Sequence, residues 1–82
     1  MFEKLKAQMA NAFRQNQLVV CIYKRTQYLL IDMHDYNREA FFIRNTPETI
    51  ARFKANNFEY GDELALSDSD LSSLKVSGLQ AY

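Results

Sequence analysis

The chain has 82 residues, with ten basic and ten acidic side chains and a formal net charge of zero. This length allows one domain, and a domain of this size buries only about 60% of its unfolded surface. Hydrophobic residues make up 48% of the chain and charged residues 24%, a balance that excludes a disordered protein. The zero net charge argues against a uniformly basic protein that binds nucleic-acid backbones.

The cysteine content and the length of the apolar runs indicate the cellular compartment of the protein. Cys21 is the single cysteine, so no internal disulfide can form, whereas small secreted domains usually carry several. Charged residues interrupt the N-terminal region, which lacks the apolar stretch of a secretory signal. The longest apolar run, residues 18–23, is far shorter than the roughly 20 residues that a membrane span needs. The sequence therefore predicts a cytoplasmic protein without a membrane partner.

The first predicted element is a helix over about residues 2–15. Phe2, Leu5, Met9 and Phe13 recur at steps of three and four residues, which places them on one stripe of an α-helix. Polar and charged side chains and three alanines occupy the other positions. Asn16 follows as a residue that commonly ends a helix.

Three strands are predicted next. Residues 18–24, 28–33 and 39–44 are rich in β-branched and aromatic side chains, and short polar segments separate them. Such short connections require antiparallel neighbours. If Arg25 and Thr26 form the first turn, Cys21 pairs with Leu30. No Asn-Gly or Asp-Gly pair marks a tight turn there, so the register stays open.

The second half of the chain is predicted to hold shorter elements. Thr46 and Pro47 indicate the start of a helix over about residues 47–56. Residues 63–66 are a candidate fourth strand. Ser67 and Asp70 resemble a weak capping box before a last short helix. Residues 79–82 are expected to form a frayed tail.

Together these elements predict a single α+β domain over residues 1–82, in the order α-β-β-β-α-(β)-α. We expect a three- to four-stranded antiparallel sheet, with the N-terminal helix and the second helix packed on one face.

The sequence predicts no catalytic residues, metal site or cofactor. Cys21, His34 and Asp35 are the residue types of a nucleophilic triad. In the hairpin considered above, however, Cys21 and His34 lie roughly 13 Å apart along the strands. A single His and a single Cys cannot form a structural zinc site. We therefore expect a protein that is not an enzyme.

The charges are divided unevenly along the chain. Residues 1–44 carry seven basic and four acidic side chains, a net of +3, whereas residues 45–82 carry three basic and six acidic ones, a net of −3. An acidic face would complement a basic groove on a partner, although a solvated surface is the simpler explanation. The candidate partner-binding residues are Glu59, Tyr60, Asp62, Glu63, Asp68 and Asp70.

The leading functional hypothesis is accordingly a small interaction protein that binds another macromolecule and regulates or sterically inhibits it. The expected partner is a protein, for example one that itself binds nucleic acid. Small neutral domains of this kind occur among accessory proteins of phages and mobile elements, including inhibitors of host defence enzymes. That analogy rests on size and composition alone.

Two alternatives remain open. Tyr23, Lys24, Arg25 and Tyr28 bracket the predicted hairpin tip and combine aromatic and basic side chains, as platforms for single-stranded nucleic acid do. A weak nucleic-acid-binding module is therefore the second hypothesis. Separately, the apolar stripe of the first helix could cover its own sheet or that of a second copy, so a homodimer is a further possibility.

Overall fold

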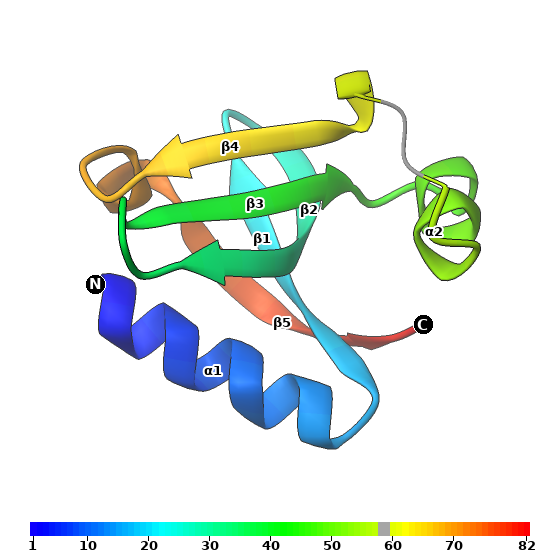
Figure 1. The fold of residues 1–82 in the computed structure, drawn as a ribbon, viewed down its shortest axis with the longest axis horizontal. Coiled ribbons are helices and arrows are strands. Elements are labelled where there is room, and N and C mark those ends of the chain that lie inside the picture. Colours follow the sequence, from blue (N-terminus) through cyan, green and yellow to red (C-terminus); the bar gives the residue numbers. More distant parts are fainter. Residues whose placement is uncertain (58–59) are drawn as a thin grey trace.

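The computed structural model describes residues 1–57 and 60–82 and shows an α+β fold. Five antiparallel strands form one sheet in the order β4-β3-β2-β1-β5. Figure 1 shows α1 crossing one side of this sheet, whereas α2 stands beside the ends of β3 and β4. Two short 3-10 helices, η1 and η2, flank β4. The elements are α1 Phe2–Arg14, β1 Gln17–Tyr23, β2 Thr26–His34, β3 Glu39–Arg44, α2 Pro47–Lys54, η1 Tyr60–Asp62, β4 Glu63–Ser67, η2 Asp70–Ser73 and β5 Lys75–Ala81.

The α1 helix buries most of its predicted stripe. Phe2, Leu5 and Met9 lie in the core, but Ala12 takes the last inward position and Phe13 stays 37% exposed. Asn16 has a φ of 56°, so it turns the chain out of the helix and into β1. Among residues 1–57 and 60–82, no helix has the length and the apolar character of a membrane span.

The first hairpin differs from the expected register by two residues. Lys24 and Arg25 form the turn, with φ angles of 49° and 67°, and Cys21 pairs with Tyr28 rather than Leu30. Positive φ at both central positions is the conformation of a tight primed turn. Lys and Arg rarely adopt this conformation, so the sequence did not indicate the position of the turn. The register of the hairpin could therefore not be predicted.

Two irregularities bend the sheet. The pairing of β1 with β5 shifts between Val20 and Cys21, and the pairing of β2 with β3 shifts between Leu30 and Asp32. Shifts of this kind increase local twist and bend a strand. Both faces of the central strands are covered. One core cluster contains the buried residues of α1, whereas the other contains Leu18, Val20, Leu29 and Ile43, with Ile50 and Phe53 of α2 packed against it.

Several expectations therefore need correction. The sheet has five strands rather than three or four, because residues 75–81 form β5 along β1. The expected frayed tail at 79–82 was wrong for the same reason, since residues 79–81 continue that strand. The two helices pack against different core clusters and not on one face. The last predicted helix is only the four-residue 3-10 helix η2.

The start of α2 and the fourth strand follow the sequence. Thr46 caps α2, and its hydroxyl accepts a hydrogen bond from the Thr49 backbone N–H, with Pro47 at the first helical position. The candidate strand at residues 63–66 is β4, which pairs with β3. α2 ends at Lys54, two residues before the predicted end.

Candidate functional site

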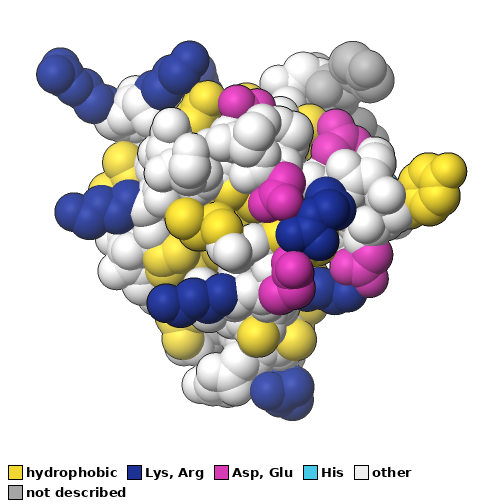
Figure 2. All heavy atoms as spheres, turned by 90° about the vertical axis from the view of Figure 1, so that its left-hand side faces the viewer, with side chains coloured by type: hydrophobic (Ala, Val, Ile, Leu, Met, Phe, Trp, Pro, Cys, Tyr) yellow, Lys and Arg dark blue, Asp and Glu magenta, His cyan; other side chains and the backbone are white. Residues whose placement is uncertain are grey.

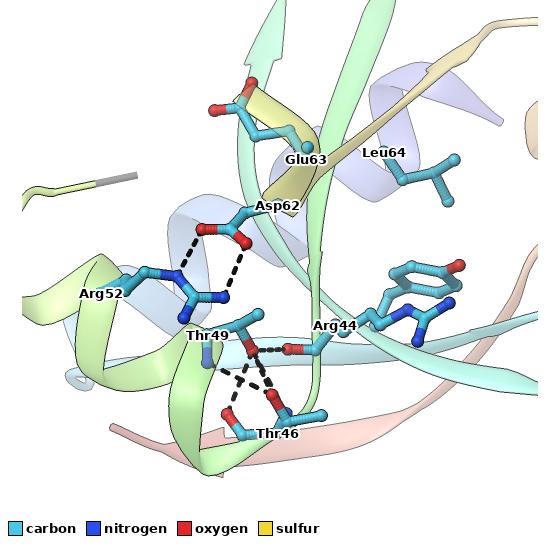
Figure 3. Close-up of a pocket in the computed structure, with 9 residues that line it drawn as sticks. Arg44, Thr46, Thr49, Arg52, Asp62, Glu63 and Leu64 are labelled. Atoms are coloured by element: carbon cyan, nitrogen blue, oxygen red, sulfur yellow. Dashed lines mark hydrogen bonds and ion pairs between the residues drawn. The ribbon is translucent and has the colours of Figure 1, made fainter. Parts of the chain in front are cut away.

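Arginines neutralise part of the predicted acidic surface. Arg52 of α2 donates two hydrogen bonds to the Asp62 carboxylate, with N–O distances of 2.6 and 2.7 Å, and the Asp62 side chain is only 11% exposed (Figure 3). Asp68 accepts a hydrogen bond from Arg38 at 2.8 Å. These two carboxylates therefore do not present uncompensated negative charge to a partner.

The other predicted acidic residues are dispersed. Glu63 is exposed at the start of β4, and Asp70 accepts a hydrogen bond from the Ser67 hydroxyl in the turn after that strand. Glu59 lies outside the described residues. Tyr60 begins η1, and its side chain is likewise outside the description. The structure does not bring this set together into one acidic face among the residues that it describes.

Arg38 joins three separate segments on one side of the molecule. Its guanidinium group donates to Glu3 of α1 and to Asp68 after β4, and it lies 4.7 Å from the centre of the Phe2 ring. The hydrogen bond from Arg38 lowers the pKa of Glu3, and the same contact raises the pKa of Arg38. Lys6 similarly pairs with Asp35. This contact removes Lys6 from the basic residues that are available to a ligand.

The hairpin tip carries basic side chains without such partners. Lys24 and Arg25 are both exposed, and within residues 1–57 and 60–82 no acidic side chain pairs with either of them. The Lys24 ammonium group lies 5.4 Å from the centre of the Tyr23 ring. Tyr23 is half-buried and packs against the core, so only part of its ring is open to a ligand.

Further basic side chains lie at the same end of β1. Lys75 begins β5 opposite Ile22 of β1, two residues before Lys24. Lys4 lines the same groove as Lys75, a hollow of about 280 Å³ between α1 and β5. Neither lysine pairs with an acidic side chain in the described part of the chain. Figure 2 shows acidic side chains gathered on one half of this side of the molecule, with Lys and Arg side chains among them, whereas the other half carries mainly Lys and Arg side chains.

Tyr28 connects the hairpin tip to a pocket. Tyr28 is the cross-strand neighbour of Arg44, and both side chains line a cavity of about 470 Å³ beside α2 and the start of β4. The Tyr28 ring meets Phe42 edge to face, with ring centres 6.5 Å apart. Figure 3 shows Arg44 across this pocket from the Arg52–Asp62 pair.

Sequence reasoning named Tyr23, Lys24, Arg25 and Tyr28 but missed Lys75 and Arg44. Both missed residues lie far along the chain from residues 23–28, and strand pairing alone brings them close. A correct hairpin register with the β2–β3 pairing would have indicated Arg44. Lys75 could not be assigned, because the sequence did not indicate β5.

Two other chemical groups do not form a site. Cys21 is fully buried, and desolvation raises the pKa of its thiol to about 12, so it is not an activated nucleophile. Among the described residues, no group of three or more His, Cys, Asp and Glu side chains could hold a metal ion.

Comparison with protein-family models, with curated proteins and with solved structures finds no match to this chain.

Proposed function

We propose that the protein is a non-enzymatic module that binds single-stranded nucleic acid through the basic end of β1. The observation that carries this proposal concerns the ion pairs: several carboxylates are paired, whereas a group of basic side chains at one end of the molecule is not. Lysine and arginine side chains pair with Glu3, Asp35, Asp62 and Asp68. In contrast, Lys4, Lys24, Arg25 and Lys75, at one end of the molecule, form no ion pair with the residues that the structure describes. A chain with zero net charge can therefore still present a basic surface.

The chemistry of this surface suits a single strand. Lysine and arginine side chains pair with phosphates without regard to sequence. Aromatic rings give unpaired bases a surface for stacking, and Tyr23 and Tyr28 lie within the same hairpin. In a duplex the base faces are covered by their neighbours. We therefore expect a single strand to bind more tightly than a duplex of equal length.

Fluorescence anisotropy with a labelled ten-nucleotide single strand tests this proposal. We expect the Lys24→Gln/Arg25→Gln variant to bind about tenfold more weakly at low salt, because two phosphate contacts are lost. The slope of log K against log salt should fall by about 1.4, which is about 0.7 for each phosphate contact to a single strand.

The matched control is the Arg14→Gln/Lys54→Gln variant, which changes the net charge equally. Arg14 ends α1, next to the opposite end of β1, and Lys54 ends α2. At about 0.1 M salt, where the Debye length is roughly 10 Å and distant charges are screened, this control should bind within about twofold of the wild type. Equal losses in both variants, or no binding at the lowest salt, would contradict the proposal.

Protein docking remains the second candidate, and β5 gives it a specific observation. β5 forms one edge of the sheet, and it exposes 41% of Val76 and 48% of Leu79. Open strand edges with exposed apolar side chains favour pairing with another chain, including a second copy. Such a partner would be retained in a pull-down, and Val76→Lys would release it.

A further inference from the structure

We propose that the pocket beside Tyr28 holds one nucleotide of the bound strand, with the base against the Tyr28 ring and the phosphate on Arg44. The inference rests on the proposed function and deepens it, because it names where one base leaves the path along the hairpin. The cavity of about 470 Å³ falls within the range of about 300–1,000 Å³ that is usual for small-molecule sites.

Arg44 is the anchor of this pocket. It ends β3, is exposed, and forms no ion pair with the residues that the structure describes. Strand pairing sets it directly opposite Tyr28, so a cation and an aromatic ring border the same hollow. A nucleotide is complementary to this pair, because its anionic phosphate can bind the guanidinium group and its flat base can stack on the aromatic ring.

The polar side chains on the opposite wall of the pocket form hydrogen bonds with other groups of the protein. The Asp62 carboxylate, which would repel a phosphate, is neutralised by two hydrogen bonds from Arg52. The Thr46 and Thr49 hydroxyl groups lie 2.8 Å apart and bond to each other, and Thr49 also donates to the Arg44 carbonyl. These groups shape the pocket without competing for Arg44. Figure 3 shows the carboxylate of Glu63 pointing away from the Arg44 side chain.

The pocket is continuous with the proposed path of the strand. Arg25 in the turn and Tyr28 near the start of β2 are three residues apart, which corresponds to about 10 Å along an extended chain. A nucleic acid whose phosphates contact the hairpin tip therefore reaches Tyr28 within a few nucleotides. We infer that Lys24 and Arg25 hold the backbone and that the pocket receives a base.

The test compares a mononucleotide with an oligonucleotide by NMR titration of the full chain. Uridine 5′-monophosphate should shift the backbone amides of Tyr28, Arg44 and Thr46. Arg44→Gln should weaken the mononucleotide about tenfold, and Tyr28→Leu should do the same, whereas Tyr28→Phe should keep the affinity because it keeps the ring. Circular dichroism confirms that each variant is folded. Arg44 is exposed, so its variant provides a reading even if Tyr28→Leu unfolds.

The outcomes separate this inference from the proposed function. Lys24→Gln/Arg25→Gln should weaken the oligonucleotide but leave the mononucleotide within about twofold. If the oligonucleotide binds through Lys24 and Arg25 while Arg44→Gln changes nothing, the pocket inference is overturned and the function stands. If neither probe binds, both fail. Equal binding of inorganic phosphate and the mononucleotide would overturn the stacking of the base.

Discussion

At the scale of single residues, the contact between Arg52 and Asp62 determines how α2 is held next to β4. It is a two-pronged pair between a guanidinium group and a carboxylate whose side chain is 11% exposed. Such geometry makes hydrogen bonds to charged groups stronger than neutral ones. The pair fixes one wall of the pocket and also removes Asp62 from the acidic surface that the sequence suggested.

We predict that Arg52→Met lowers the free energy of unfolding by about 2 kcal/mol, because it removes two hydrogen bonds from the largely buried Asp62 carboxylate. Urea denaturation measures this loss. The matched control is Lys54→Met on the same helix, at an exposed position, which should change stability by less than about 0.5 kcal/mol. Equal effects of the two substitutions would show that the ion pair contributes nothing.

Single residues also show which local features a sequence can reveal. Thr46 and Pro47 were predicted correctly as the start of α2, because a cap depends on adjacent residue types. Lys24 and Arg25 were not predicted in the left-handed conformation, because neither residue favours it. Their backbone is set by the strands on either side, which bury apolar residues on both faces. The register of the hairpin is thus a tertiary property.

At the scale of elements, Arg38 connects α1 to the turns at one end of the sheet. It binds Glu3 at the start of α1 and Asp68 beyond the end of β4. The Arg38 hydrogen bond lowers the pKa of Glu3 below its ordinary value of 4.5. The contact therefore stabilises the folded protein above the unfolded pKa, and this contribution disappears as the pH falls through the folded pKa.

We predict that the stability advantage of the wild type over Arg38→Met is present at pH 6 and shrinks as the pH is lowered below about 4.5. Thermal melts at a series of pH values measure the difference between the two proteins. Arg14→Met serves as the control, since Arg14 contacts the neutral Asn11 side chain and its effect should not follow the protonation of Glu3. A pH-independent difference for Arg38→Met would rule out the Glu3 contact as its cause.

At the scale of the whole molecule, the balance of charge acquires a spatial meaning. The total is zero, and the sequence divides it into a positive and a negative half. Folding pairs carboxylates from both halves with arginines and lysines, and it leaves basic side chains of α1, the hairpin and β5 at one end. Linear charge patterns could not predict this outcome, because it depends on contacts such as Glu3 with Arg38, which are 35 residues apart.

The C-terminal strand is the largest part of the fold that the sequence did not predict. Residues 75–81 combine exposed positions with a glycine and lack a strong strand pattern, yet they pair with β1 over most of its length. The burial of β1 explains why this strand pairs with β5. β1 is covered on both faces and would otherwise leave one edge without hydrogen-bond partners.

We therefore predict that deleting residues 79–82 destabilises the protein by on the order of 3 kcal/mol or more, enough to remove much of the stability of a domain this small. The deletion removes the pairs of Val19 with Leu79 and Leu18 with Gln80, and it breaks the contact of the Gln80 amide with Asn45. Deleting Tyr82 alone is the matched control. It keeps the strand pairing and removes the ring contact with Phe53, so a loss below about 1 kcal/mol is expected. Circular dichroism melts of the two truncated chains distinguish a structural strand from a dispensable tail. A cooperative transition at the wild-type temperature in the longer truncation would show that β5 does not hold β1 in place.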